Sequence, residues 1–320
     1  MARRVLIAGL VAALTAVAAA CTPDTSGITT GKLMNETLSS GRSYLLFVPS
    51  SYSTRSSPAP LILSYHGGNR NASQQAALDL LTSTFFNVEY VVAYPQGIND
   101  RWQGVPGVTT NDTAFTASIL SALSSKLCLD SSRIFATGKS DGAGFVGDVL
   151  ACDAVLSRRV AAVAPVSGAF YAPNNTDRGA GCDPYTVVNA CNTNSRVDIP
   201  VIEFHGGNDT TIPYGGGVRR RACLPYVPHW VQIWAGRDGL GTANSSYNLT
   251  ADATVYQFGA GAEGGVVTHV FDGGSVGHSW PATIWNDDNE HNGDGPASFN
   301  ASSVIVEFFQ TWSSRGRRAF

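Results

Sequence analysis

The sequence predicts an α/β protein built on a single doubly wound, mostly parallel sheet. Three observations favour this class. Short apolar runs bounded by turn residues recur along the chain, candidate helices lie between them, and no linker or shift in composition divides the 320 residues. Such alternation covers a parallel sheet with helices on both faces. We therefore expect one domain over residues 21–320.

The predicted strands are nearly continuous runs of aliphatic and aromatic residues, which is typical of strands buried on both faces. An antiparallel pair at the sheet edge comes first, at 34–38 and 42–49. The central strands are expected at 60–65, 90–94, 134–137, 161–166 and 200–205, with another at 266–271. Helices are expected at 73–86, 112–126, 143–152 and 302–312. Two segments are expected as insertions over the sheet edge. One is the loop-rich segment 173–196, and the other is 219–255, where a helix, a loop and a strand are expected in that order.

Residues 1–20 have the pattern of a secretory signal peptide. Arg3 and Arg4 precede an apolar stretch, and Ala18-Ala19-Ala20 offers a small-residue cleavage site. The apolar stretch is shorter than the roughly 20 residues that a membrane span needs. A lipoprotein signal that modifies Cys21 is the other alternative. We expect a secreted, extracellular protein.

The cysteines and glycosylation sequons agree with export. The six cysteines form an even set, which indicates disulfides, and Cys128 with Cys152 is the preferred pair because it would flank the 134–137 strand. No Cys/His spacing typical of zinc occurs, and we expect no metal and no cofactor. Sequons begin at Asn35, Asn71, Asn111, Asn174, Asn208, Asn244, Asn248 and Asn300. We expect Asn208 to stay unmodified for lack of access.

Charge excludes some classes of partner. The net charge is -3, and only 14% of the residues are charged. A nucleic acid or an anionic membrane surface would call for a basic surface, so neither is an expected partner. The runs Arg219-Arg220-Arg221 and Arg315 to Arg318 are interpreted as a solvated loop and tail. A small-molecule or polysaccharide ester fits better, and we expect a monomer.

Gly138-Lys139-Ser140-Asp141-Gly142 matches the G-x-S-x-G nucleophile elbow, in which a serine on a tight strand-to-helix turn presents its hydroxyl. A second match, at Gly273 to Gly277, centres on Ser275. Only Ser140 follows an apolar strand and precedes residues with helical spacing. Ser275 is followed by His278 and Trp280-Pro281, where no helix can begin. Ser140 is the predicted nucleophile.

A serine nucleophile needs a base and an acid that orients the base, in the chain order Ser, Asp, His for this kind of elbow. Asp209 directly follows the 200–205 strand, and His278 follows the 266–271 strand. The weaker alternatives are Asp198, Asp238 and Asp272 for the acid, and His229, His269 and His291 for the base. Asp209 and His278 are therefore the predicted partners of Ser140.

An oxyanion hole needs two backbone N–H groups aimed at the developing negative charge. Asp141, the residue after the nucleophile, supplies the first. Gly68 in Tyr65-His66-Gly67-Gly68 supplies the second, with Gly67 as the alternative. The acidic run 287–291 lacks the glycine of a calcium loop and is interpreted as solvated.

Several motifs together resemble the secreted fungal feruloyl esterases of type C, relatives of polyhydroxybutyrate depolymerases and acetylxylan esterases. They extend over nearly the whole mature chain: Tyr65-His66-Gly67-Gly68, Tyr94-Pro95-Gln96-Gly97, Trp102-Gln103-Gly104, the Ser140 elbow, Leu150-Ala151-Cys152-Asp153, Pro165 to Tyr171, His205-Gly206-Gly207-Asn208-Asp209 and Gly277-His278-Ser279-Trp280-Pro281. One departure is Ala143, where such relatives often have glycine.

The resemblance implies an α/β-hydrolase fold and a serine esterase that hydrolyses ferulate esters on arabinoxylan. It also implies Ser140, Asp209 and His278 as the triad, and Trp102 and Gln103 as walls of the acyl site. An acetylxylan esterase or polyhydroxyalkanoate depolymerase with the same triad is the alternative. A non-catalytic carbohydrate-binding protein on a hydrolase fold is a further one.

Overall fold

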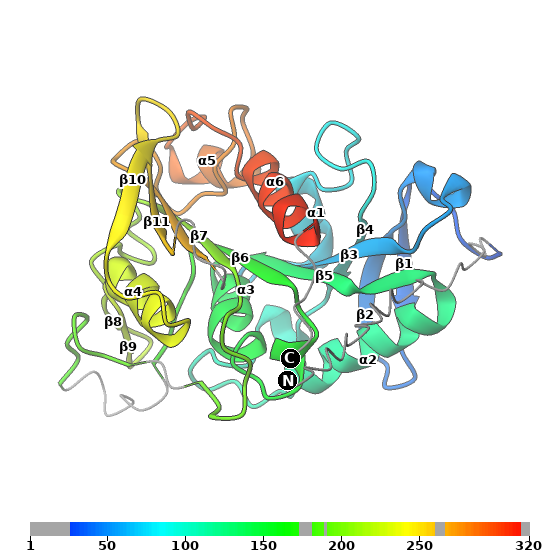
Figure 1. The fold of residues 1–320 in the computed structure, drawn as a ribbon, viewed down its shortest axis with the longest axis horizontal. Helices are drawn as coiled ribbons and strands as arrows, with labels where there is room; N and C mark the ends of the chain where they lie inside the picture. The colour runs from blue at the N-terminus through cyan, green and yellow to red at the C-terminus, as the bar shows by residue number, and fades with distance from the viewer. Residues whose placement is uncertain (1–25, 173–180, 189–190, 260–265, 315–320) are drawn as a thin grey trace, which may run out of the picture.

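The computed structural model describes residues 26–172, 181–188, 191–259 and 266–314 (Figure 1). Ten strands of this part form one sheet in the order β1-β2-β4-β3-β5-β6-β7-β12-β11-β10. Helices pack on both of its faces, which confirms the predicted α/β class. The predicted signal peptide lies outside the described residues. Among the helices that are described, none is both long and apolar enough to cross a membrane.

The centre of the sheet consists of six parallel strands. In spatial order they are β4 (Val91–Pro95), β3 (Ala59–Tyr65), β5 (Leu129–Lys139), β6 (Ala162–Val166), β7 (Val201–Gly206) and β12 (Val267–Asp272). Antiparallel strands complete both edges: β1 (Leu33–Thr37) and β2 (Ser43–Phe47) on one side, β11 (Ala253–Phe258) and β10 (Asn244–Asn248) on the other. The apolar runs in the sequence predicted all of these except β10 and the exact span of β11.

Two separate hydrophobic clusters cover the two faces. One contains side chains of α2 (Asp112–Lys126), of the π-helix Phe145–Leu150 and of α4 (Val227–Arg237). The other contains side chains of α1 (Ala72–Asp79) and α6 (Ala301–Ser314). In Figure 1, α1 and α6 accordingly lie on the opposite side of the sheet from α3 (Asp141–Gly144) and α4. The sheet is therefore doubly wound.

The remaining short elements connect this frame. They are α5 (Asp287–Asn292), the hairpin strands β8 (Gly217–Arg219) and β9 (Ala222–Leu224), and the 3-10 helices Ser50–Thr54, Ile98–Asp100 and Leu156–Arg158.

Two predicted helices differ from those observed. The first ends at Asp79 instead of residue 86, because Leu80 adopts a left-handed conformation with φ 53° that stops the helix. The second begins at Asp141 and passes into the π-helix Phe145–Leu150. Ala143, the departure noted in the sequence, is fully buried there without interrupting the helix. In the segment 219–255 a hairpin precedes the helix, and this hairpin was not predicted.

The preferred disulfide Cys128–Cys152 is wrong. Cys152 is bonded to Cys191, and Cys182 to Cys223. The Asn192 N–H donates to the Cys152 carbonyl, so the loop before β7 lies directly against the end of the π-helix and brings Cys191 to Cys152. Cys128 is disulfide-bonded as well. Asn208 is exposed, so lack of access is no reason for it to stay unmodified.

Candidate active site

Ser140 occupies a strained turn between β5 and α3. Its φ is 55° and its ψ -117°, a conformation that residues with side chains rarely adopt. A Cβ at Gly138 would lie 2.8 Å from the Tyr65 carbonyl oxygen, and one at Gly142 would lie 2.5 Å from that of His66. The carbonyls at the end of β3 thus press against the turn, and both glycines of the motif are needed to form it.

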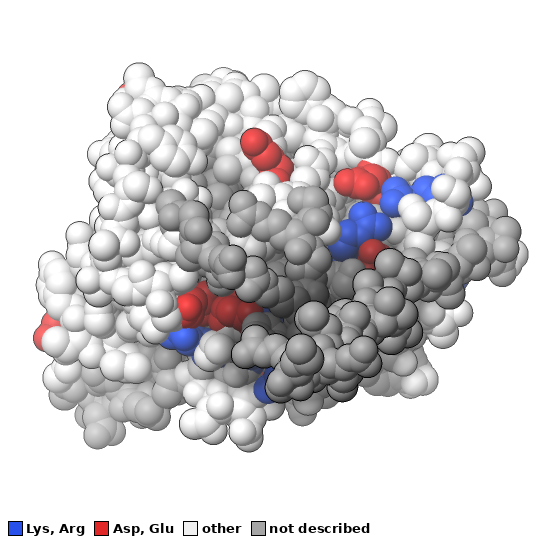
Figure 2. All heavy atoms as spheres, in the orientation of Figure 1, with Lys and Arg blue, Asp and Glu red and all other residues white. Residues whose placement is uncertain are grey.

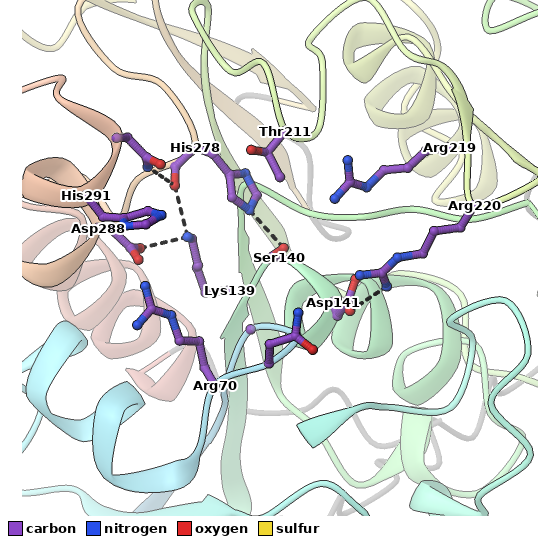
Figure 3. A pocket seen from close by; sticks show the side chains of 14 residues that line it. Arg70, Lys139, Ser140, Asp141, Thr211, Arg219, Arg220, His278, Asp288 and His291 are labelled. Atoms are coloured by element: carbon purple, nitrogen blue, oxygen red, sulfur yellow. Dashed lines mark hydrogen bonds and ion pairs between the residues drawn. The ribbon is translucent and has the colours of Figure 1, made fainter. Parts of the chain in front are cut away.

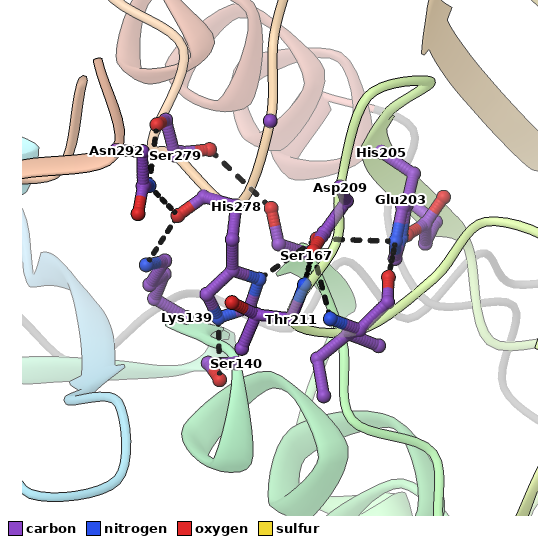
Figure 4. A network of polar contacts seen from close by, with 12 residues as sticks. Lys139, Ser140, Ser167, Glu203, His205, Asp209, Thr211, His278, Ser279 and Asn292 are labelled. Carbon is purple, nitrogen blue, oxygen red and sulfur yellow. Dashed lines mark hydrogen bonds and ion pairs between the residues drawn. The ribbon is translucent and has the colours of Figure 1, made fainter. Parts of the chain in front are cut away.

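The structure brings Ser140, His278 and Asp209 into one hydrogen-bonded chain (Figure 4). The Nε2 atom of His278 lies 2.9 Å from the Ser140 Oγ, and its Nδ1 lies 2.7 Å from the Asp209 Oδ2. The three residues follow the carboxyl ends of β5, β12 and β7, which meet at one edge of the parallel sheet. This is the arrangement that nucleophilic catalysis by serine needs.

Asp209 is held in its ionised form. Its Oδ1 accepts the backbone N–H groups of Thr211 at 2.9 Å and Ile212 at 2.7 Å. Burial acts to raise the pKa of Asp209, but the hydrogen bonds with His205 and His278 outweigh it and keep the pKa well below its ordinary range. A charged carboxylate therefore faces His278 Nδ1 and favours the tautomer whose Nε2 accepts from Ser140.

His278 is a neutral base near neutral pH. Burial, followed by the nearby charge of Lys139, lowers the pKa of His278 below 6.5, although Asp209 acts in the opposite direction. A neutral imidazole can accept the proton of the Ser140 hydroxyl.

The backbone of His278 is also fixed. Lys139 Nζ donates to the His278 carbonyl at 2.9 Å and pairs with Asp288 at 2.8 Å, while Asn292 Nδ2 donates to the same carbonyl at 2.7 Å. Asp288 lies buried in α5, so the interpretation of the acidic run as merely solvated is wrong for this residue. The two Lys139 contacts join segments 139 and 149 residues apart, and no local pattern indicates them.

A second buried network lies behind Asp209 (Figure 4). His205 Nδ1 is 2.9 Å from the Glu203 Oε1, and its Nε2 is 2.8 Å from the Ile212 carbonyl oxygen and 3.4 Å from the Asp209 Oδ2. Both ring nitrogens face acceptors, so both carry protons. Burial acts to lower the pKa of His205, but Asp209 and Glu203 raise it to about 10. His205 is thus a buried cation between two carboxylates.

His269 completes this network from β12. Its Nδ1 lies 2.6 Å from the Glu203 Oε2, and its Nε2 lies 3.1 Å from the Tyr214 hydroxyl. The sequence prediction that His269 is a packed residue is confirmed. The roles of Glu203 and His205 were not predicted, although a glutamate within the apolar run 200–205 was a signal that a buried partner must exist.

Gly68 and Asp141 meet at the predicted oxyanion hole. A Cβ at Gly68 would collide with the Asp141 carboxylate, and one at Gly67 would lie 3.5 Å from the Ser140 Cβ. Asp141 is the first residue of α3, whose first N–H groups have no partner within the helix. The Gly67-Gly68 segment and the first residue of α3 thus lie side by side next to Ser140.

Trp102 supports this loop and does not line the cavity, contrary to its predicted role as an acyl-site wall. Its side chain is fully buried, and its indole N–H donates to the His66 carbonyl at 2.7 Å. The ring turns inward because it packs against Tyr65 and Phe145. It therefore fixes the backbone that precedes Gly67 and Gly68.

Gln103 lines a separate small hollow of about 100 Å³ beside the elbow. The apolar part of this hollow includes Val105, Phe145 and Val149, and Asp141 lies at its border with the main cavity. The Gln103 Oε1 accepts the N–H groups of Asp112 and Thr113, so the side chain also caps α2.

The main cavity in front of Ser140 has a volume of about 200 Å³ (Figure 3). Its lining is polar and charged, and consists of Gly67, Gly68, Asn69, Arg70, Lys139, Ser140, Asp141, Thr211, Arg219, Arg220, His278, Asp288, His291 and Asn292.

The alternative site residues lie outside the Ser140 chain. Ser275 is exposed, and both its N–H and its hydroxyl donate to the Asp272 Oδ1. Asp238 accepts the Asp198 N–H, and His229 Nε2 is 3.0 Å from the Val187 carbonyl oxygen. His291 lines the main cavity.

Comparison with known proteins adds sequence relatives. No protein-family model matches the chain. The chain is 31% identical to feruloyl esterase C of Emericella nidulans over 185 residues. This aligned region covers 56% of this chain and 58% of that protein. It is 28% identical over 211 residues to probable feruloyl esterase C of Aspergillus oryzae, with 64% and 68% covered. For feruloyl esterase B of Piromyces equi, only 31% of the relative is covered. The chain is thus a homologue of fungal proteins named feruloyl esterase C, and it spans less than two thirds of several of them.

Solved structures show the same fold. Acetyl xylan esterase from Aspergillus awamori superposes with a TM-score of 0.58 at 18% identity, over 87% of this chain and 99% of that one. A protein named pOPH gives a TM-score of 0.51 at 15% identity, over 90% and 88%. The fold is that of the α/β-hydrolases.

Proposed function

We propose that this protein is a secreted serine carboxylic ester hydrolase that releases ferulate from arabinose side chains of xylan. The observation that carries the proposal is the hydrogen-bonded chain from Ser140 through His278 to Asp209, set beside Gly68 and the first turn of α3. The named relatives support the ester class.

The proposed mechanism uses only groups of this chain. His278 Nε2 takes the proton from the Ser140 hydroxyl while the Oγ attacks the ester carbonyl, and the backbone N–H groups of Gly68 and Asp141 stabilise the oxyanion. The tetrahedral intermediate then collapses. The bond to the sugar oxygen breaks, and His278 returns the proton to that oxygen.

A water molecule repeats the sequence on the acyl-enzyme. His278 removes its proton, the hydroxide adds to the acyl carbon, and Ser140 leaves with the proton from His278. Asp209 remains ionised throughout and stabilises the imidazolium. The low pKa of Asp209 and the lowered pKa of His278 both suit these roles.

The hollow beside Asp141 is the proposed site of the acyl group. Val105, Phe145 and Val149 give it apolar walls, while the main cavity is open enough for a sugar. A substrate carbonyl placed at Ser140 would lie between this hollow and the main cavity.

A second candidate, hydrolysis of a smaller acyl group such as the acetate of acetylxylan, is favoured by one observation. Among the described residues that line the main cavity, no aliphatic, Phe, Tyr or Trp side chain is present, and the adjoining hollow measures only about 100 Å³. A polyhydroxyalkanoate is the remaining alternative.

Initial rates on methyl ferulate, acetylated xylan and polyhydroxybutyrate, measured side by side with Ser140→Ala as the background, test the proposal. We expect methyl ferulate to give the highest kcat/KM. A faster rate on acetylated xylan would identify acetyl esters, and not ferulate esters, as the preferred substrates. Equal, negligible rates for both proteins on all three would favour a non-catalytic binding protein.

A further inference from the structure

The cavity in front of Ser140 carries more positive charge than the rest of the molecule would suggest. Its lining includes four cationic side chains, of Arg70, Lys139, Arg219 and Arg220, but only two carboxylates, of Asp141 and Asp288. The whole chain, by contrast, has a net charge of -3. On the face drawn in Figure 2, Lys and Arg are few and lie beside Asp and Glu.

The carboxylates do not neutralise all of these cations. Lys139 pairs with Asp288 at 2.8 Å, and Arg220 pairs with Asp141 at 2.9 Å. Asp141 also faces Arg101 at 3.7 Å, and Arg70 pairs with Asp287 at 3.5 Å. Arg219 has no carboxylate partner among the described residues, and Figure 3 shows its guanidinium pointing toward the space between Thr211 and Ser140.

A buried donor of this guanidinium is unsatisfied. The Arg219 Nε has no hydrogen-bond partner within the part of the chain that the structure describes, and the Tyr171 hydroxyl, which faces Arg219 and Arg220, completes no hydrogen bond of ordinary geometry there. The Arg220 guanidinium lies 6.0 Å from the Tyr171 ring. Unpaired buried donors are rare in native proteins and call for an explanation, such as a ligand that accepts from them.

The turn that presents these arginines is itself strained. β8 and β9 pair Arg219 with Ala222, so Arg220 and Arg221 form the two-residue turn, with φ values of 47° and 65°. Turns with two positive φ values favour Asn-Gly, and a long side chain at each position costs free energy. Such strain persists only where the surrounding structure fixes the turn.

The hairpin is held firmly in place. Cys223 of β9 is bonded to Cys182 and forms an antiparallel bridge with Ala172, the residue after Tyr171. All three residues of β9 are buried. The arginines at its tip are therefore fixed beside the elbow and not carried on a free loop, which disagrees with the solvated loop that the sequence indicated.

We propose that Arg219, together with Arg220, binds a carboxylate of the substrate, so that an ester whose acyl or alcohol portion carries an acidic group is preferred over the matched neutral ester. Two guanidinium groups offer planar, paired N–H donors that match a carboxylate. The proposal rests on the proposed esterase function for its catalytic part. An acidic sugar next to the ester is the alcohol-side form of such a substrate.

The test compares kcat/KM for charged and neutral esters. One pair varies the acyl part, 4-nitrophenyl hydrogen succinate against 4-nitrophenyl acetate, and the other varies the alcohol part, acetylated glucuronic acid against acetylated glucose. For at least one pair we expect the charged ester to be preferred, and the ratio to fall about tenfold in Arg219→Gln, as the loss of one charge-assisted contact predicts. Added salt should lower the same ratio.

Matched variants separate charge at this site from charge nearby. Arg221→Gln removes an exposed guanidinium from the same turn and should leave the ratio unchanged. Arg219→Lys should retain most of the preference for the charged ester. Equal ratios in the native protein and in Arg219→Gln for both pairs would overturn the proposal.

Binding provides a readout that does not need activity. Ligand-observed NMR with the Ser140→Ala protein should detect glucuronate or succinate more strongly than glucose, and Arg219→Gln should abolish the difference. If no ester is hydrolysed but this preference is found, the esterase proposal fails and the carboxylate site stands. Without a preference in either experiment, the carboxylate site is refuted.

Discussion

The regions behind and in front of Ser140 are built in opposite ways. Behind it, at the ends of β7 and β12, the side chains of Asp209, His205 and Glu203 are buried, and each contacts a partner of opposite charge or a hydrogen-bonding group. In front of it, Arg219 extends from a strained hairpin and has no carboxylate partner in the described part of the chain. The difference teaches that the proposed chemistry depends on closed networks fixed at strand ends, while selectivity depends on an open rim that can vary without disturbing them.

The largest expected effect is on the residue that the two regions share. Ser140→Ala should lower kcat on any hydrolysed ester by about 10⁶-fold, because no other group can form the acyl-enzyme. Ser275→Ala is the matched control in the second G-x-S-x-G segment and should keep the native rate. A loss of activity in Ser275→Ala alone would identify Ser275 as the nucleophile in place of Ser140.

Within the rear region, Asp209→Asn should lower kcat by about 10⁴-fold. The amide stabilises neither the imidazolium nor the tautomer of His278 that accepts from Ser140. Steady-state rates with a folded-state check by circular dichroism measure the effect. A decrease of less than tenfold would argue that another carboxylate orients His278.

His205→Gln should reduce the unfolding free energy by about 3 kcal/mol, because two buried carboxylates then lose their common cation. Urea unfolding measures this change. The pKa of His205 is raised to about 10 in the folded protein, from an ordinary value of 6.5. Its stabilisation is therefore complete below pH 6.5 and is lost as pH rises toward 10.

The variant should consequently show a weaker loss of stability than the native protein between pH 7 and 10. His269→Gln is the control, because His269 contacts Glu203 but not Asp209. It should change kcat less than His205→Gln does. A larger effect on kcat in the control would contradict the role of His205 as a residue that positions Asp209.

The smallest expected effect is a shift in pH dependence. Burial and the charge of Lys139 lower the pKa of His278, so the acid limb of kcat/KM should lie below pH 6.5. Lys139→Gln removes the positive charge, so the pKa of His278 should rise and the acid limb should move to higher pH. An acid limb that stays in place would show that the charge of Lys139 does not contribute to this pKa.

The parts that could be predicted from the sequence are those encoded locally. Continuous apolar runs marked the buried strands, and Ser140, Asp209 and His278 each follow such a strand in the order that the mechanism needs. A candidate catalytic residue that lies within a few residues of a strand end can be predicted, because its position depends on neighbours in the chain.

The parts that were missed depend on packing between distant segments. The Lys139–Asp288 pair and the Cys152–Cys191 disulfide join segments whose contact no local pattern encodes. The inward turn of Trp102 follows from its contacts with Tyr65 and Phe145, and the family resemblance, which implied a cavity wall, did not indicate these contacts. The strained hairpin at Arg220 was hidden because its residues violate the usual turn preferences.

Covalent labelling with a fluorophosphonate tests the central claim most directly. This reagent reacts with a serine hydroxyl that a neighbouring base activates, so it reports on the Ser140–His278–Asp209 chain without any assumption about the substrate. The account predicts one adduct per molecule, on the peptide that contains Ser140, with none in Ser140→Ala. An unlabelled native protein, or an adduct on the Ser275 peptide instead, would contradict it.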